Sequence, residues 1–216
     1  LDAAVQGALV SKYRNSGQTC VCTNRILVQD SIHDEFVSKL VAATAELKMG
    51  NGLDEGVQQG PLVNVGAVDD VEQLVHRSTE AGAHIALGGA RSDLGPCYYQ
   101  PTVLTGVTPD MAVFRNEIFG PVAPVTAFRD EAEAIALAND TEFGLASYFY
   151  TRDIGRVWRV AEALDYGMVG INEGIISNEM APFGGVKASG SGREGSKYGI
   201  DDYLEIKYIL MGGLDR

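Results

Sequence analysis

One segment, residues 146–172, constrains the fold of this chain more than any other. Residues 146–150 (ASYFY) and 168–172 (MVGIN) each predict a strand, and Asp153 can cap a helix between them. The apolar residues of that helix recur at helical spacing: Ile154, Val157, Trp158, Ala161 and Leu164. A strand, helix and strand with short links form a βαβ unit, whose strands run parallel. This segment therefore predicts an α/β fold with three layers, in which helices cover a mainly parallel sheet.

The rest of the chain supplies the remaining elements of such a fold. Apolar periodicity predicts helices over residues 1–10, 32–47, 65–81 and 130–139, and strands over 24–29, 84–87, 102–104 and 122–128. Asp130 and Glu133 form a candidate capping box. Residues 203–210 (YLEIKYIL) alternate between apolar and polar, which predicts a late strand. Little chain follows to cover it, so we expect it to pair with another subunit of an oligomer.

Charge and cysteine content exclude several classes of protein. Seventeen basic against 29 acidic residues give a net charge of −12, which disfavours binding to a nucleic-acid backbone. The chain has no apolar run of about 18 residues, the length that a membrane-spanning helix needs. Three cysteines cannot all pair, so a reducing compartment is expected. We expect the cytoplasm, with the mitochondrial matrix as the alternative, and see no targeting segment.

The loop that follows the second strand of the βαβ unit is a candidate site. In open parallel sheets, ligands gather beyond the carboxyl ends of the strands. Residues 173–187 occupy that position and include Ser177. A serine in a loop has no specific meaning by itself.

Residues 15–22 (NSGQTCVC) contain a candidate nucleophile. Cys20 follows a polar turn with a glycine, between a predicted helix and a predicted strand. Free backbone N–H groups in such a loop favour the thiolate, which is a strong nucleophile. The alternative is a small buried apolar residue, the commoner role of a free cysteine and the simplest interpretation of Cys22. We expect no metal site, because the three histidines lack ligand spacing to the cysteines.

Two further motifs carry groups that could bind a cofactor or a substrate. Glu117 and Phe119 lie two residues apart before a strand, where a carboxylate can hold ribose hydroxyls and a ring can flank a nicotinamide. The alternative is a loop acid beside a core phenylalanine. Arg14 could grip a carboxylate in bidentate fashion, or could simply complement the dipole at a helix end.

A third motif is rejected as a phosphate-binding loop. Residues 190–195 (GSGREG) match the GxGxxG pattern. A dinucleotide fingerprint must follow an apolar strand and open a βαβ unit, and neither condition holds here. We expect these glycines to form a tight loop.

Taken together, residues 15–20 (NSGQTC), 117–121 (EIFGP) and 182–190 (PFGGVKASG) resemble signature motifs of the aldehyde dehydrogenase family, and the resemblance covers the whole chain. The resemblance implies that Cys20 attacks an aldehyde carbon to form a thiohemiacetal and then a thioester, with NAD or NADP as cofactor. It also implies that Glu117 holds the nicotinamide ribose, that Phe119 flanks the ring and that Phe183 lines the aldehyde channel. The backbone N–H of Cys20 would be one oxyanion donor.

Residues 14–22, 170–178 and 195–208 resemble family members that act on aldehydes carrying a carboxylate. This resemblance implies that Arg14 and Ser177 hold the substrate carboxylate, and that Cys20 and Cys22 form a redox switch. The expected substrate is succinate semialdehyde, with glutarate semialdehyde as the alternative. The two substrates differ by one methylene, which a pocket distinguishes only modestly.

The resemblance also implies a division of the chain. We expect a catalytic domain over residues 1–200 and an oligomerisation strand and tail over residues 201–216, in a homo-oligomer. The family's general-base glutamate and dinucleotide-binding domain would lie upstream of residue 1, so the chain alone would be inactive. Two alternatives of other classes are a thiol hydrolase, which would need a histidine near Cys20, and a non-catalytic binding or assembly domain.

Overall fold

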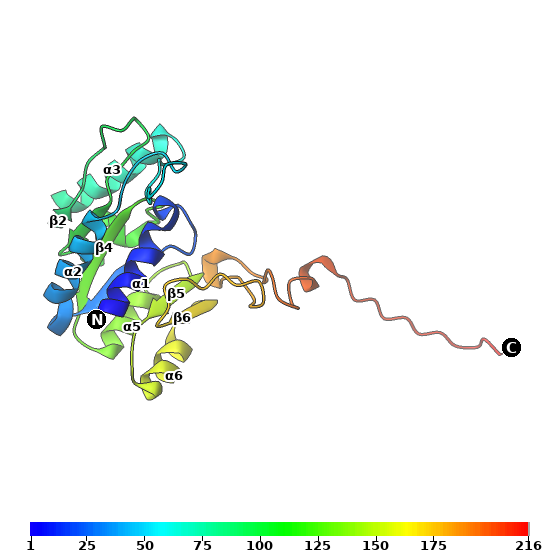
Figure 1. The fold of residues 1–216 in the computed structure, drawn as a ribbon. Helices are drawn as coiled ribbons and strands as arrows, with labels where there is room; N and C mark the ends of the chain where they lie inside the picture. Colours follow the sequence, from blue (N-terminus) through cyan, green and yellow to red (C-terminus); the bar gives the residue numbers. More distant parts are fainter. Residues whose placement is uncertain (216) are drawn as a thin grey trace.

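The computed structural model describes residues 1–215 and contains the predicted succession of helices and strands (Figure 1). The helices are α1 (Asp2–Tyr13), α2 (His33–Ala45), α3 (Val65–Glu80), α4 (Ala112–Arg115), α5 (Glu131–Asn139) and α6 (Ile154–Ala163). The strands are β1 (Ile26–Gln29), β2 (His84–Leu87), β3 (Thr102–Thr105), β4 (Val122–Phe128), β5 (Ala146–Phe149) and β6 (Met168–Ile171). Short 3-10 turns lie at η1 (Arg14–Gly17), η2 (Asp30–Ile32), η3 (Lys187–Ser189) and η4 (Asp201–Tyr203).

The larger sheet has the strand order β1-β4-β3-β2. Strand β4 pairs in parallel with both β1 and β3, whereas β2 is antiparallel to β3. The first five residues of β4 are buried, as expected of a strand that is covered on both faces. The prediction of a mainly parallel sheet is therefore confirmed.

Helices cover both faces of this sheet, which makes three layers. On one face, Val5 of α1 and Leu40 of α2 pack against Val125 of β4. On the other face, Val71 of α3 packs against Val122 of β4. Alternate residues of one strand thus enter two separate cores, which is the period-two pattern of a buried strand.

The predicted βαβ unit forms a second, two-stranded sheet. Strands β5 and β6 are parallel, with Ala146 opposite Met168, and α6 connects them. The Asp153 carboxylate caps α6 by accepting hydrogen bonds from the backbone N–H groups of Gly155 and Arg156, at 2.8 and 3.2 Å. The side chains of Arg156 and Arg159 both pair with Glu131 on α5, which ties the two helices together.

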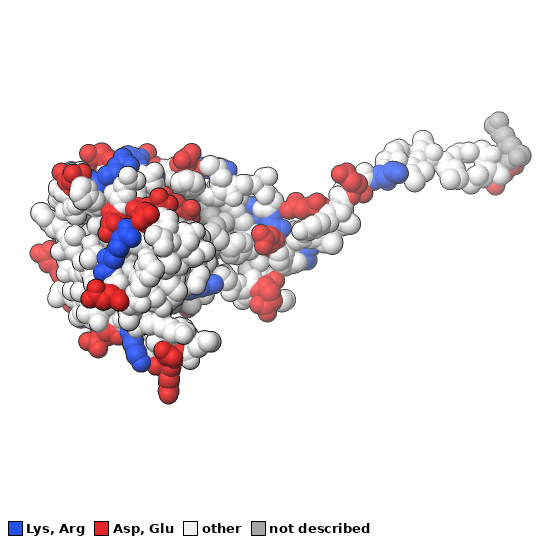
Figure 2. All heavy atoms as spheres, turned by 90° about the horizontal axis from the view of Figure 1, so that it is seen from above, with Lys and Arg blue, Asp and Glu red and all other residues white. Residues whose placement is uncertain are grey.

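Residues 203–210, predicted as a strand that pairs with another subunit, form no strand within the single chain. Tyr203 ends the turn η4, and the residues after it are extended and exposed and have no strand partner within residues 1–215. Figure 1 shows this tail leaving the body of the molecule, and Figure 2 shows few charged atoms along it. A strand needs a ladder of hydrogen bonds, and this single chain offers none there. Residue 216 of the predicted tail lies outside the described residues.

Helix α4 was not predicted, because a four-residue turn carries no periodicity. No helix within the described residues combines the length and the apolar character needed to cross a membrane.

Candidate active site

The link from α1 to β1 holds Cys20 at the surface. Asn15, Ser16 and Gly17 adopt left-handed backbone angles, with φ of 50°, 55° and 76°. The Ser16 hydroxyl donates to the carbonyl of Gly60 at 3.1 Å, which helps to fix this unusual run. A reverse turn follows, in which the N–H of Cys22 donates to the carbonyl of Thr19 at 2.9 Å. Cys20 lies inside that turn and is exposed.

The backbone N–H of Cys20 has no hydrogen-bond acceptor among residues 1–215. A free N–H next to an exposed thiol is able to donate to an oxygen of a bound molecule. The loop therefore presents an exposed thiol and a free N–H donor on the same residue.

The motif around Cys20 lies directly against the motif that carries Glu117. A Cβ atom at Gly17 would overlap the backbone carbonyl of Gly120, so only glycine allows this approach. The Asn24 side chain joins the same two segments: it donates to the Asn116 carbonyl at 2.8 Å and accepts from the Ile118 N–H at 2.9 Å. Segments that are about 100 residues apart in the sequence thus form one surface.

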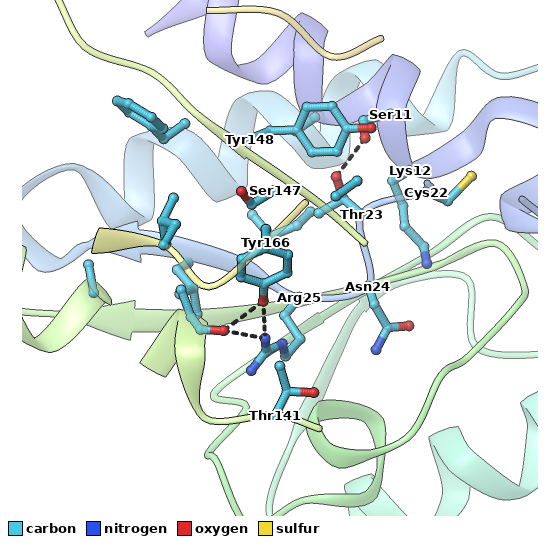
Figure 3. A pocket seen from close by; sticks show the side chains of 18 of the residues that line it. Ser11, Lys12, Cys22, Thr23, Asn24, Arg25, Thr141, Ser147, Tyr148 and Tyr166 are labelled. Carbon is cyan, nitrogen blue, oxygen red and sulfur yellow. Dashed lines mark hydrogen bonds between the residues drawn. The ribbon is translucent and has the colours of Figure 1, made fainter. Parts of the chain in front are cut away.

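This surface forms part of the wall of a cavity of about 650 Å³ (Figure 3). Cys20, Cys22, Glu117 and Phe119 all line it, as does Lys12. The size suits a small cofactor or substrate. No histidine of the described residues lines the cavity.

Glu117 and Phe119 are both accessible in this cavity. The carboxylate of Glu117 is exposed and forms no ion pair within residues 1–215. Phe119 has a left-handed backbone, with φ of 49°, and 44% of its surface is exposed. A strained, exposed aromatic residue gains little from core packing, and such strain tends to occur at functional sites. The alternative of a core phenylalanine is therefore wrong for Phe119.

Arg14, Ser177 and Phe183 lie outside the lining of the cavity. Arg14 is exposed, and its guanidinium makes no hydrogen bond or ion pair within the described residues. Ser177 is exposed in the loop after β6, and no hydrogen bond joins it to Arg14. Phe183 is partly buried and pairs with Glu194 through two backbone hydrogen bonds of 2.9 and 2.7 Å.

The loop after β6 nevertheless approaches α1. A Cβ atom at Gly174 would overlap the backbone carbonyl of Gly7, so this loop packs on the helix that leads to Arg14. The glycines of the rejected GxGxxG motif follow η3, with positive φ at Gly190, Gly192 and Gly195. They form a tight loop, as expected.

Sequence reasoning missed two residues of the site. Lys12, on the last turn of α1, is only 1% exposed, and burial lowers the pKa of its ammonium to about 8, with a partial offset from Cys22 and Glu117. Tyr148 of β5 donates from its hydroxyl to the carbonyl of Val21, between the two cysteines, at 2.8 Å. The apolar period could place Tyr148 on a strand, but no local signal predicts this long-range bond.

The sequence model of the aldehyde dehydrogenase family matches residues 1–209. A glutarate-semialdehyde dehydrogenase of Pseudomonas aeruginosa is 61% identical over 214 residues, which are 99% of this chain and 44% of that protein. A mitochondrial succinate-semialdehyde dehydrogenase of Oryza sativa subsp. japonica is 58% identical over 215 residues, which are 100% of this chain and 41% of that protein.

A crystal structure described as an E. coli NADP-dependent enzyme superposes with a TM-score of 0.96 at 58% identity, covering 98% of this chain and 44% of that one. The chain thus spans less than half the length of the proteins that it matches. The family match over residues 1–209 includes both loops that meet at Gly17 and Gly120.

Proposed function

Because the chain belongs to the aldehyde dehydrogenase family, we propose that it carries the nucleophile of an enzyme that oxidises an aldehyde to a carboxylic acid with NAD or NADP. One observation carries this proposal. Cys20 is exposed on the wall of a cavity whose other side chains include Glu117 and Phe119, from a motif distant in the sequence. A thiol, a free carboxylate and an exposed ring together suit covalent catalysis beside a nicotinamide.

The Cys20 thiolate attacks the aldehyde carbon, and the carbonyl oxygen gains negative charge. The free N–H of Cys20 can donate to this oxygen in the resulting thiohemiacetal. After oxidation of the adduct, water hydrolyses the thioester and releases the acid. The exposed position of Cys20 leaves room for both the aldehyde and the water.

The residues present fit a nicotinamide cofactor. The Glu117 carboxylate is free to accept hydrogen bonds from ribose hydroxyls, and the accessible face of Phe119 would flank the ring. When bound, the cofactor supplies the acceptor for the hydride that the thiohemiacetal loses.

We assign the substrate to aldehydes that carry a carboxylate, with succinate semialdehyde first and glutarate semialdehyde as the alternative. The unpaired guanidinium of Arg14 and the hydroxyl of Ser177 are the groups that would hold the carboxylate, and Phe183 would line the channel to it. The names of the two relatives support both substrates.

Cys20 and Cys22 form the proposed redox switch. Both lie in the turn closed by the Thr19 carbonyl, and both are free thiols. A turn brings their backbones closer than an extended chain would, toward the usual disulfide range of about 4.4–6.8 Å between Cα atoms.

The exposed tail is the proposed contact of a homo-oligomer. Ile206, Tyr208 and Leu210 are 101%, 83% and 82% exposed, and the backbone beside them is unpaired within the described chain. An extended apolar segment of this kind is able to add a strand to a partner subunit. Deletion of residues 204–216 from the full-length protein should reduce the number of subunits in the oligomer, as measured by light scattering.

Steady-state rates of the full-length protein over a panel of aldehydes, with both coenzymes, test the proposed activity. We expect reduction of NAD or NADP that depends on the aldehyde, and a preference for carboxylated aldehydes. Ester hydrolysis without coenzyme reduction would instead favour a thiol hydrolase. We also propose that residues 1–216 alone are inactive, since the family's general base is expected upstream of them.

A further inference from the structure

The backbone before Cys20 needs support from outside its own loop. Asn15 and Ser16 both have positive φ, which costs free energy in residues with a side chain. Such a conformation persists only where neighbouring groups hold it. Residues 59–63, which we call the clamp, lie against this loop and make four hydrogen bonds with it.

Gln18 makes two of these bonds, from a position two residues before Cys20. Its side-chain carbonyl accepts from the Val63 N–H at 2.8 Å, and its amide group donates to the Pro61 carbonyl in a longer bond of 3.4 Å. The same amide group also donates to the Asn15 carbonyl, at 3.2 Å. One carboxamide thus connects the strained loop to the clamp, and it uses both of its N–H groups and its carbonyl oxygen to do so.

Gln59 makes the contact at the other end of the loop. Its side chain is only 3% exposed, and its amide group donates to the Tyr13 carbonyl at 2.8 Å, where α1 ends. The side-chain carbonyl oxygen of Gln59 has no hydrogen-bond partner within residues 1–215, so burial of this side chain has a cost in free energy. The bond to Tyr13 fixes the point at which the loop leaves the helix.

The clamp is itself anchored to the body of the molecule. The N–H of Leu62 donates to the Cys97 carbonyl at 2.8 Å, and the Leu62 side chain is buried in the core on the α3 side of the larger sheet. The N–H of Gly50 donates to the Gln59 carbonyl at 3.0 Å. A segment that is fixed in this way is able to set the position of the loop that it contacts.

We propose that Gln18 is a positioning residue for Cys20, and that the clamp is the fixed surface against which Gln18 holds the nucleophile. This inference rests on the proposed function. Gln18 acts through the backbone of Thr19, which leads directly to Cys20 and whose carbonyl closes the turn around it. An error of about 1 Å in the position of a reacting group is able to lower the rate by about 100-fold.

The proposal separates turnover from coenzyme binding. The proposed coenzyme contacts, Glu117 and Phe119, come from another loop and make no hydrogen bond to the clamp within residues 1–215. Loss of the Gln18 bonds should therefore lower kcat and leave the KM for the coenzyme unchanged.

The first measurement is hydrogen exchange of the full-length protein with Gln18→Met. Methionine is a flexible side chain of similar length that makes none of the three hydrogen bonds. We expect the Cys22 amide, which donates to the Thr19 carbonyl, to exchange roughly tenfold faster than in the parent, because lost hydrogen bonds ease local opening. Residues 26–29 of β1 should keep their rates. Gln73→Met is the matched control, because Gln73 is exposed on α3 and its side chain makes no hydrogen bond within the described chain.

The second measurement is the rate of coenzyme reduction per folded molecule, with the folded fraction taken from urea unfolding. We expect Gln18→Met to lower kcat by roughly 10- to 100-fold and to change the KM for the coenzyme by less than about twofold. A residue that only stabilises the fold would leave kcat per folded molecule unchanged. Gln59→Met loosens the clamp from its other side, so it should also lower kcat, and it replaces Gln18→Met if that variant does not fold.

Unchanged exchange at Cys22, or an unchanged kcat per folded molecule where the parent is active, would overturn the proposal. Equal effects of Gln18→Met and Gln73→Met on exchange would overturn it as well. The exchange measurement needs no turnover, so failure of the proposed function would appear separately, as absence of coenzyme reduction by the parent.

Discussion

Gly17 and Gly120 are in backbone contact, and this contact joins the loop of Cys20 to the loop of Glu117 and Phe119. A Cβ atom at Gly17 would overlap the carbonyl oxygen of Gly120, and the φ of Gly17 is 76°. Both the space and the backbone angle therefore require glycine at this position. This approach, together with the two hydrogen bonds of the Asn24 side chain, sets the placement of Cys20 relative to Glu117 and Phe119.

Gly17→Ala should destabilise the protein and separate the two loops. The left-handed backbone alone costs a residue with a side chain roughly 1–3 kcal/mol, and the overlap with backbone adds to this. Urea unfolding measures the loss. Gly52→Ala is the matched control, because a Cβ there meets nothing within 4 Å. Equal effects of the two substitutions would contradict the importance of the contact.

Tyr148→Phe should loosen the cysteine turn. The substitution leaves the Val21 carbonyl without its 2.8 Å hydrogen bond, at a cost of about 1 kcal/mol in unfolding free energy. Tyr208→Phe, at a tyrosine that is 83% exposed, is the control and should be neutral. If both variants unfold at the same urea concentration as the parent, the Tyr148 bond does not support the turn.

The fold was largely predictable because its elements carry strong local signals. Asp153 marked the start of α6, and the nearly continuous apolar run of β4 fits a strand covered on both faces. The strand predicted for residues 203–210 stays a prediction, because a strand forms only with a partner and the expected partner is another subunit. Helix α4 was not predicted because its four residues are too few to show a helical period.

The site was predictable where motifs were local. Cys20, Glu117 and Phe119 were found from short segments, and the structure brings them to one cavity. Lys12 was missed because lysines are almost always exposed, so nothing in its type or spacing indicates burial. The contact between Gly17 and Gly120 was missed because it joins segments about 100 residues apart.

Arg14→Ala should impair oxidation of a carboxylated aldehyde far more than that of an uncharged one. Loss of one partner of a desolvated charge pair costs about 2–5 kcal/mol, which lowers kcat/KM by about 30-fold or more. With the carboxylated aldehyde, the kcat/KM of Arg14→Lys should lie between those of the parent and Arg14→Ala, because lysine keeps the charge and loses the bidentate geometry. Rates with succinate semialdehyde and an uncharged aldehyde of similar length give the comparison. Equal losses with both aldehydes would make Arg14 a structural residue.

Glu131 should contribute stability that depends on pH. Hydrogen bonds from Arg159 and Arg156 lower the pKa of Glu131 to about 2, below its ordinary value of 4.5. A lowered carboxyl pKa adds stability that is fully present above the ordinary value and is lost as the pH falls toward the folded one. The difference in unfolding temperature between the parent and Glu131→Gln should thus be constant above about pH 5 and shrink toward pH 2. Glu46→Gln, at an exposed carboxylate without an ion pair in the described chain, should show no such trend.

The most direct measurement traps the covalent intermediate on the full-length protein. The protein is mixed with succinate semialdehyde and coenzyme, quenched in acid and digested, and the peptide that contains both cysteines is sequenced by mass spectrometry. The account predicts a succinyl group on Cys20 and none on Cys22, and no adduct in Cys20→Ala although that variant stays folded. An adduct on another residue, or normal turnover by Cys20→Ala, would contradict the assignment of Cys20 as the nucleophile.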